Sequence, residues 1–218
     1  MDVSFAIFDM DGTLVDSMPF WDRLTEEYLE SLQLPPEEHL DLKDAVAHMG
    51  MHEAAELFQQ ALELDKTPED IVLEMGDLMD RHYQEDIQLR PGVKAFLEGM
   101  RGEGIPMCVL TLTPTPLAHL CLDRLGVAEY FAFILSSDDV GLGKDRPEIF
   151  AQAAMEFGVY PMESIVFEDS HYAARAAKAA GCTVVGIFEP THAENWPQMQ
   201  RYCDVTVMDW HEAMNLLY

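Results

Sequence analysis

The chain has 218 residues, long enough to bury a substantial core, and 49% of them are hydrophobic. It carries 13 Lys and Arg against 40 Asp and Glu, a formal net charge of -27. A surface this acidic repels nucleic-acid phosphates and anionic membranes, so we expect no nucleic acid and no membrane among its partners.

The first element in chain order is the apolar run Val3–Phe8, which predicts a buried strand. It ends in Asp9 and Asp11, which are separated by one residue and followed at once by Gly-Thr. Two carboxylates that project near one point raise each other's pKa unless a cation lies between them. The pair is therefore either an acidic turn in open solvent or part of a metal site.

Residues 16–89 contain no strand pattern. Their apolar residues recur at helical spacing in four segments, which are Trp21–Leu32, Leu40–His48, His52–Leu62 and Pro68–Tyr83. Proline and glycine residues separate these segments, and the sequence Arg90-Pro91-Gly92 follows the last of them. We therefore expect an all-helical insertion directly after the first strand.

Strand and helix patterns alternate over the rest of the chain. Short apolar runs predict five further strands: Met107–Leu112, Phe131–Leu135, Ile165–Phe167, Val184–Phe188 and Val205–Met208. Because these runs are continuous rather than alternating, we expect strands buried on both faces. Helical patterns lie between them at Gly92–Glu103, Pro116–Leu125, Arg146–Phe157 and Tyr172–Ala180. The expected fold is α/β, a Rossmann-like doubly wound parallel sheet core (residues 1–15 and 90–218) with an inserted all-helical cap domain (residues 16–89).

Several polar side chains follow the predicted strands or open a loop, at the edge where parallel sheets bind their ligands. They are Asp9, Asp11, Thr111, Lys144, Glu168 and Asp169. Carboxylate oxygens suit Mg²⁺, and a hydroxyl and an ammonium would hold a phosphoryl group. Each residue also has an ordinary structural interpretation, such as a helix cap formed by Asp169. Their order and spacing together indicate a phosphoryl-transfer site.

Four segments resemble the motifs of the haloacid-dehalogenase-like hydrolase superfamily: "FDMDGTLVDS", "VLTLT", "GKDRPEIF" and "IVFEDSHYAARAAKAAG". The position of the helical insertion resembles the β-phosphoglucomutase-like branch of that superfamily. The resemblance implies a phosphatase in which Asp9 is the nucleophile that becomes an aspartyl-phosphate and Asp11 is the general acid/base. It also implies a Mg²⁺ cofactor, whose ligands would be Asp9, Asp11, Glu168 and Asp169.

The second, third and fourth motifs depart from the family pattern, and the fourth has Ala173 where a Gly is common. The second motif has Leu112 after its first hydroxyl residue, so phosphate binding is assigned to Thr111 and Leu112, with Thr113 as the alternative hydroxyl. The third motif reads "GKDRP" rather than Lys-Pro-x-Pro, and Lys144 keeps the role of the phosphate-binding cation. Arg146 in that motif either enlarges the anion site or faces water.

By the same resemblance, Asp11 favours phosphatase or phosphomutase chemistry. Residues 16–89 hold four basic side chains against twenty acidic ones, and Glu53 stands where the mutases carry an Arg for the distal phosphate. Such a cap is unfavourable to a second phosphate, so we expect hydrolysis of a small phosphomonoester, a sugar or polyol phosphate. A β-phosphoglucomutase-type sugar phosphomutase and a non-catalytic binding module are the alternatives.

Four residues of the insertion are candidates for contacts with the substrate, and ordinary helix packing is the alternative for each: His48, Met49, His52 and Trp21. The four cysteines lack CxxC spacing, and no basic segment precedes the first apolar run. We therefore expect reduced thiols, no signal peptide and a cytoplasmic location. The expected partner is a small phosphorylated metabolite, and a monomer is the default expectation.

Overall fold

The computed structural model describes residues 3–46, 49 and 51–217. The chain divides into two compact units, which we call the core (Met1–Ser17 with Ile87–Tyr218) and the cap (Met18–Asp86). The boundaries expected from the sequence lie within three residues of these. Within the described ranges, every helix is too short or too polar to span a lipid bilayer.

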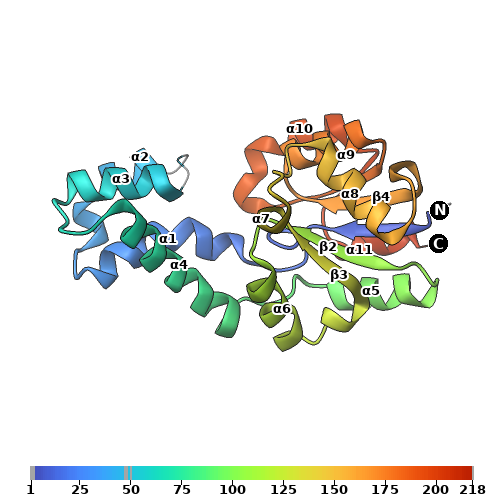
Figure 1. The fold of residues 1–218 in the computed structure, drawn as a ribbon, viewed down its shortest axis with the longest axis horizontal. Helices are drawn as coiled ribbons and strands as arrows, with labels where there is room; N and C mark the ends of the chain where they lie inside the picture. The colour runs from blue at the N-terminus through green and yellow to red at the C-terminus, as the bar shows by residue number, and fades with distance from the viewer. Residues whose placement is uncertain (1–2, 47–48, 50, 218) are drawn as a thin grey trace. The chain divides into compact units, whose positions relative to one another are not determined.

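The core is built on a six-stranded sheet, in which each predicted strand is confirmed (Figure 1). Its strands are β1 (Phe5–Phe8), β2 (Met107–Thr111), β3 (Phe131–Ser136), β4 (Ser164–Glu168), β5 (Thr183–Ile187) and β6 (Val205–Val207). They lie in the order β3-β2-β1-β4-β5-β6, and all neighbouring strands pair in parallel. The chain changes direction across the sheet between β1 and β4, and ligands bind at such a switch point.

The edge strands are less buried than their apolar sequences predict. The inner strands β1, β2 and β4 are buried at every residue. In contrast, Ala132 of β3 and Val205 of β6 are exposed. The expectation of burial on both faces is wrong for these two strands, because each has a neighbouring strand on one side only.

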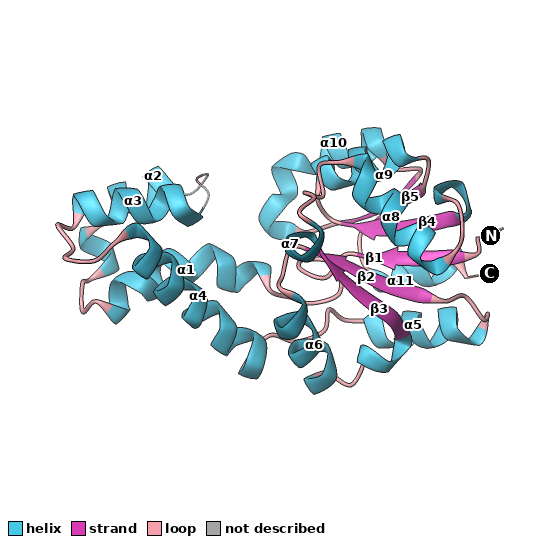
Figure 2. Cartoon of the chain, viewed as in Figure 1, coloured by secondary structure: helices cyan, strands magenta, loops and turns pink. Residues whose placement is uncertain are grey.

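Helices cover both faces of the sheet (Figure 2). One face carries α5 (Val93–Gly102), α6 (Thr115–Arg124) and α11 (Trp210–Ala213), and the other carries α8 (Pro147–Phe157), α9 (His171–Ala180) and α10 (Trp196–Tyr202). The four helices predicted for this part of the chain, α5, α6, α8 and α9, are confirmed. The short helices α7 (Ser137–Val140), α10 and α11 were not predicted, because four to seven residues show no clear apolar periodicity.

An aromatic cluster supports the loop that follows β1. Trp210 is buried against Phe8, Phe96 and Phe167, with ring centroids 4.9 to 6.0 Å from its own. Its indole N–H donates a hydrogen bond to the backbone carbonyl of Thr13, 2.9 Å away. The core therefore fixes the turn that comes directly after the first carboxylate pair.

The described residues of the cap form four helices, α1 (Met18–Ser31), α2 (Leu40–Val46), α3 (Met51–Ala61) and α4 (Pro68–Glu85), and the 3-10 turn η1 (Pro36–Glu38). They confirm the all-helical insertion predicted between the first two strands. Thr67 and Asp70 form a capping box that begins α4. Tyr28 and Phe58 are fully buried, with ring centroids 5.5 Å apart. The cap therefore has a hydrophobic core of its own.

The two connections between core and cap pair with each other inside the core. Val15 and Leu89 form an antiparallel bridge. The backbone N–H of Asp16 donates to the carbonyl of Gln88, 2.9 Å away. The chain therefore leaves the core and returns to it at adjacent points.

Candidate active site

Three buried carboxylates lie at the carboxyl ends of β1 and β4. Asp9 directly follows β1, Glu168 is the last residue of β4, and Asp169 comes next. The two strands pair in parallel with Phe8 opposite Phe167, so their ends are adjacent. One oxygen atom from each of the three carboxylates lies within 4.8 Å of the others. The fold thus brings together three of the four residues expected to bind a metal.

The ammonium group of Lys144 lies among these carboxylates. Its Nζ is 2.6 Å from Asp9 Oδ1 and 2.7 Å from Glu168 Oε1. Lys144 comes from the loop before α8, and only 4% of its surface is exposed. One ammonium does not balance three carboxylates, so the group carries excess negative charge when all three are ionised.

Burial and mutual repulsion raise the pKa values of the acids in this group. Burial, with the nearby Glu168 carboxylate, raises the pKa of Asp9 to about 7. Burial likewise raises the pKa of Glu168 to about 7, and it raises the pKa of Asp169. Burial alone would lower the pKa of Lys144, but Asp9 and Glu168 outweigh it and hold that pKa above its usual value. A further cation among the carboxylates would relieve this repulsion.

The residues of this group fit Mg²⁺. Asp9 Oδ2 is buried and has no hydrogen-bond partner among the described residues, which is unusual for a carboxylate oxygen inside a protein. Asp9, Glu168 and Asp169 offer only oxygen donors, and hard divalent cations prefer such donors. The Mg²⁺ cofactor predicted from the sequence is therefore compatible with the donor set.

The carboxylate of Asp11 is held by hydroxyl groups. Ser17 Oγ donates to Asp11 Oδ1 over 2.7 Å, and Thr113 Oγ1 donates to Asp11 Oδ2 over 2.6 Å. Thr111 Oγ1 lies 3.4 Å from the same Oδ2 atom. This carboxylate is not part of the group formed by Asp9 and its two partners. The expected roles of Asp11 as a metal ligand and as the acid/base stay predictions.

The residues expected to bind phosphate lie at the end of β2 and directly after it. Thr111 is fully buried, and its hydroxyl oxygen accepts the backbone N–H of Thr113 at 3.0 Å. Leu112 is 49% exposed and can offer phosphate only backbone groups. Both threonine hydroxyls lie near Asp11, so the choice between them stays open. Arg146 is exposed and lies 3.5 Å from the carboxylate of Glu148.

The cap residues expected near the substrate have contacts within the cap. Trp21 is half-buried and donates through Nε1 to the hydroxyl of Tyr83 at 3.3 Å. His52 is exposed and lies 3.7 Å from Glu56, and Met49 is half-buried. His48 lies outside the described residues. Their roles in specificity stay predictions.

Sequence reasoning missed a histidine beside the carboxylate group. His192 lies in η4 (Pro190–Asn195), a 3-10 turn after β5, and its Nδ1 is 3.7 Å from Asp169 Oδ2. The Asp169 carboxylate raises the pKa of His192. The sequence offered only a general signal, because the carboxyl ends of parallel strands meet at one edge of a sheet. The pairing of β5 with β4, which brings His192 to the carboxylates, is seen only in the structure.

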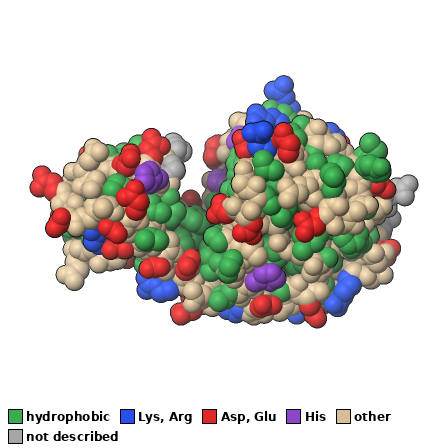
Figure 3. Space-filling model, in the orientation of Figure 1, with side chains coloured by type: hydrophobic (Ala, Val, Ile, Leu, Met, Phe, Trp, Pro, Cys, Tyr) green, Lys and Arg blue, Asp and Glu red, His purple; other side chains and the backbone are tan. Residues whose placement is uncertain are grey.

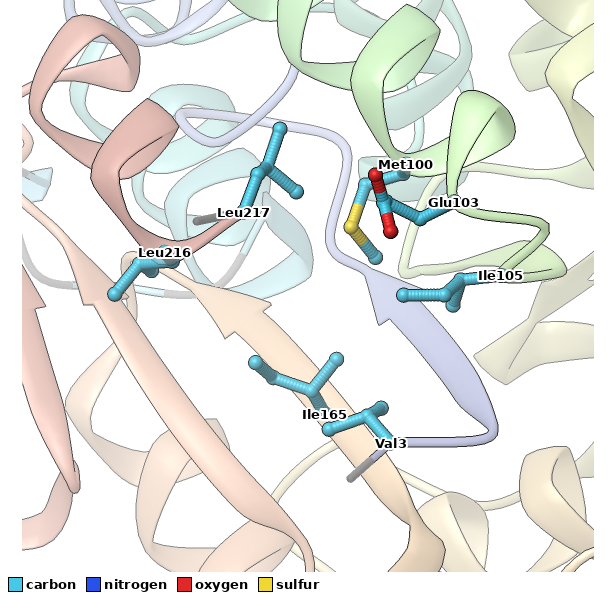
Figure 4. A pocket seen from close by; sticks show the side chains of 7 residues that line it. All are labelled: Val3, Met100, Glu103, Ile105, Ile165, Leu216 and Leu217. Atoms are coloured by element: carbon cyan, nitrogen blue, oxygen red, sulfur yellow. The ribbon is translucent and has the colours of Figure 1, made fainter. Parts of the chain in front are cut away.

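A separate cavity of about 160 Å³ lies at the opposite edge of the sheet (Figure 4). Val3 precedes β1, Ile105 precedes β2, and Ile165 lies near the start of β4. The remaining lining residues are Met100, Glu103, Leu216 and Leu217. This cavity belongs to the amino ends of the strands, and the carboxylates lie at their carboxyl ends.

The structure combines a parallel sheet, buried acids at the carboxyl ends of its strands and a helical insertion after β1. The family model of haloacid dehalogenase-like hydrolases matches residues 4–181. The chain belongs to this family of hydrolases, which confirms the superfamily named from its motifs.

Curated relatives support the same class of enzyme. The chain is 31% identical over 190 residues to the phosphorylated carbohydrates phosphatase of Thermotoga maritima, covering 87% of this chain and 86% of that protein. It is 32% identical over 205 residues to the phosphoglycolate phosphatase of Escherichia coli K12, covering 85% and 81%. These relatives confirm the expectation of an enzyme of the phosphatase class.

Solved structures share the fold over the whole chain. A putative β-phosphoglucomutase from Thermotoga maritima superposes with a TM-score of 0.83 at 28% identity, covering 99% of this chain and 98% of that one. A predicted phosphoglycolate phosphatase from Haemophilus somnus gives a TM-score of 0.82 at 24% identity, covering 100% and 99%. At 24% identity, the comparison with the Haemophilus somnus structure shows a shared fold only.

Proposed function

We propose that the chain is a Mg²⁺-dependent phosphatase that acts through an aspartyl-phosphate on Asp9. The observation that carries the proposal is the buried group of Asp9, Glu168 and Asp169 with Lys144 beside it. A carboxylate nucleophile, oxygen donors for a divalent cation and an ammonium for phosphoryl oxygens are the parts that phosphoryl transfer needs.

In the first step, the Asp9 carboxylate attacks the phosphorus atom of the ester, and the bond from phosphorus to the ester oxygen breaks. Asp11 donates a proton to the leaving alkoxide. Lys144 lies 2.6 Å from Asp9, so its charge acts on the oxygens of the transferring group. Bound Mg²⁺, held by Asp9, Glu168 and Asp169, would supply further charge neutralisation of that group.

In the second step, Asp11 takes a proton from a water molecule, whose oxygen attacks the phosphorus atom. The bond to Asp9 then breaks, inorganic phosphate leaves, and the free carboxylate is restored. The hydrogen bonds from Ser17 and Thr113 suit this double role, because they hold both oxygens of Asp11 in place.

The substrate that we propose is a small phosphomonoester, such as a sugar or polyol phosphate. Both lysines of the cap are already paired with its own acids, Lys43 with Glu26 at 2.5 Å and Lys66 with Glu74 at 2.6 Å. Acidic side chains are spread over the visible surface of the cap, where few basic ones appear (Figure 3). A second phosphate group would meet repulsion there. The name of the Thermotoga maritima phosphatase, which acts on phosphorylated carbohydrates, supports this substrate class.

A sugar phosphomutase is the second candidate function. Its support is the fold shared with the putative β-phosphoglucomutase. A mutase holds a bisphosphate at both ends, so it needs a free cation in the cap. The paired lysines of the cap favour hydrolysis instead. As part of the proposal, the enzyme works as a monomer in the cytoplasm, where its four free cysteines stay reduced.

The test of the chemistry is hydrolysis of an aryl phosphate with and without Mg²⁺. Asp9→Asn should abolish turnover. Asp145→Asn, which changes an exposed carboxylate next to Lys144, is the matched control and should keep turnover. Full activity of Asp9→Asn would exclude Asp9 as the nucleophile. An unmodified chain that shows no Mg²⁺-stimulated hydrolysis would overturn the proposed phosphatase and favour the non-catalytic binding module.

The test of the substrate is a screen of sugar monophosphates, sugar bisphosphates, phosphoglycolate and polyol phosphates. We expect the highest kcat/KM with a sugar or polyol monophosphate. Isomerisation of a hexose 1-phosphate primed by a hexose bisphosphate would instead establish the mutase. A strong preference for phosphoglycolate would overturn the proposed substrate class and leave the chemistry intact.

A further inference from the structure

Arg90 and Glu189 form a buried ion pair that the proposed mechanism does not use. Arg90 Nη1 is 3.2 Å from Glu189 Oε2, and the two side chains are 11% and 3% exposed. Arg90 lies just after the connection that returns from the cap, and Glu189 lies two residues after β5. Removing two charges from water offsets much of their attraction, so such a pair contributes little net stability. Its geometry is the more informative property.

The guanidinium group of Arg90 joins two loops at the edge of the sheet that carries the carboxylates. It donates to the backbone carbonyl of Gly12, in the loop after β1, and to that of Phe188, after β5, at 2.6 Å. The backbone N–H of Arg90 donates to the carbonyl of Leu14, 2.9 Å away. A planar fork of donors fixes such partners in direction as well as in distance.

Glu189 fixes the start of the turn that carries His192. Its second oxygen, Oε1, accepts the backbone N–H of Thr191 at 3.1 Å and the hydroxyl of Thr191 at 3.0 Å. These bonds cap η4, so the direction of the turn depends on the Glu189 carboxylate. Arg90 in turn sets the position of that carboxylate.

His192 is the end of this series of contacts. Its Nδ1 faces Asp169 Oδ2 at 3.7 Å, and its side chain is 35% exposed whereas that of Asp169 is 5% exposed. Groups that contact a metal-binding carboxylate from outside set its orientation and the affinity of the site.

We propose that Arg90, Glu189 and His192 are positioning residues for the Mg²⁺ site. The ion pair sets the η4 turn, the turn places His192 against Asp169, and His192 orients the Asp169 carboxylate toward Asp9 and Glu168. This inference rests on the proposed function, because it assigns the three residues to the site at which that function places Mg²⁺.

The experiment measures Mg²⁺ binding to the full chain by calorimetry in the absence of substrate. Glu189→Gln keeps the shape of the side chain and removes its charge, and we expect it to weaken Mg²⁺ binding about 10-fold. His192→Ala should do the same, and His192→Asn, which keeps a donor near the position of Nδ1, should restore most of the affinity. Because the residues act in series, the double variant Glu189→Gln/His192→Ala should bind Mg²⁺ no more than about 3-fold more weakly than either single variant.

The matched control is Asp204→Asn. Asp204 also accepts from a cation, Lys178, and from a backbone N–H, that of Val184 at 2.9 Å, but it has no contact with the carboxylate group. We expect this variant to lose thermal stability and to bind Mg²⁺ as the unmodified chain does. The comparison separates a positioning effect from a general loss of stability.

The outcomes distinguish the inference from the function on which it rests. An unmodified chain that binds no Mg²⁺ would overturn the proposed function and the inference together. If the unmodified chain binds Mg²⁺ and a folded Glu189→Gln variant binds it equally well, only the inference is wrong. Fully additive losses in the double variant would also overturn it, because independent effects exclude action in series.

Discussion

Replacing Asp9 by Asn should stabilise the metal-free protein while abolishing turnover. Burial, with the Glu168 carboxylate, raises the pKa of Asp9 from 3.8 to about 7 on folding. Between these two values the folded chain binds more protons at Asp9 than the unfolded chain does. Stability therefore falls as the pH rises through this window, and the full penalty is present above pH 7. Asn carries no charge and does not incur this penalty.

The size of the expected stabilisation follows from the shift in the pKa of Asp9 on folding. Each pKa unit corresponds to about 1.4 kcal/mol, so ionised Asp9 costs the folded core about 4 kcal/mol. This cost already includes the attraction of Lys144, which lowers the pKa of Asp9. We therefore expect a stabilisation of about 4 kcal/mol at most, or a rise in Tm of about 8–16 °C for a chain of this length.

The assay is thermal unfolding followed by circular dichroism at pH 8 in the presence of a chelator. Asp204 provides the opposite case. Burial alone would raise the pKa of Asp204, but the hydrogen bond from Lys178 lowers that pKa overall, so Asp204→Asn should lower Tm. Added Mg²⁺ should raise the Tm of the unmodified chain more than that of Asp9→Asn. A lower Tm for Asp9→Asn than for the unmodified chain at pH 8 would refute the reasoning.

Three further predictions concern the acid/base and the cap. Asp11→Asn should keep Mg²⁺ binding, measured by calorimetry, and lose about 10²–10⁴-fold in turnover, and unchanged turnover would exclude Asp11 as the acid/base. Burial alone would lower the pKa of His82, but hydrogen bonds to Glu27 at 2.6 Å and to Asp86 at 2.8 Å raise it overall. The stability that His82 gives the cap should therefore be complete below pH 6.5 and decline as the pH rises through the higher folded pKa. Thermal unfolding between pH 5 and 9 should therefore show a smaller decline in His82→Gln than in the unmodified chain, because Asp9 contributes the same decline to both. Phe58 is fully buried, so Phe58→Ala should destabilise the cap by about 3–5 kcal/mol in urea unfolding, and a loss below about 1 kcal/mol would contradict the packing described for the cap.

The sequence predicted the central part of the site because two simple patterns coincide there. A continuous apolar run precedes both Asp9 and Glu168, and such runs indicate inner strands of a parallel sheet. Parallel strands present their carboxyl ends at one edge, so residues far apart in the chain were expected to meet. The structure places them together through the pairing of β1 with β4.

The supporting residues could not be predicted in the same way. Arg90 and Glu189 lie in loops, where no periodicity indicates which side chains are buried. Their pairing depends on the directions of the side chains after β5 and after the connection that returns from the cap. The amino-acid sequence does not indicate these directions. His192 was missed for a related reason, because its turn follows a strand whose end holds no carboxylate pair. The contacts made by short elements and loops are thus the part of the site that only the structure reveals.

The paired connections between core and cap give the insertion the character of an exchangeable module. Because Val15 and Leu89 bridge each other, a segment of any length can enter and leave there without changing the register of β1 and β2. The entropy of closing such a segment rises only slowly with its length. On the proposed function, descendants of this chain could acquire new substrates by replacing Met18–Asp86 while inheriting the phosphoryl chemistry unchanged.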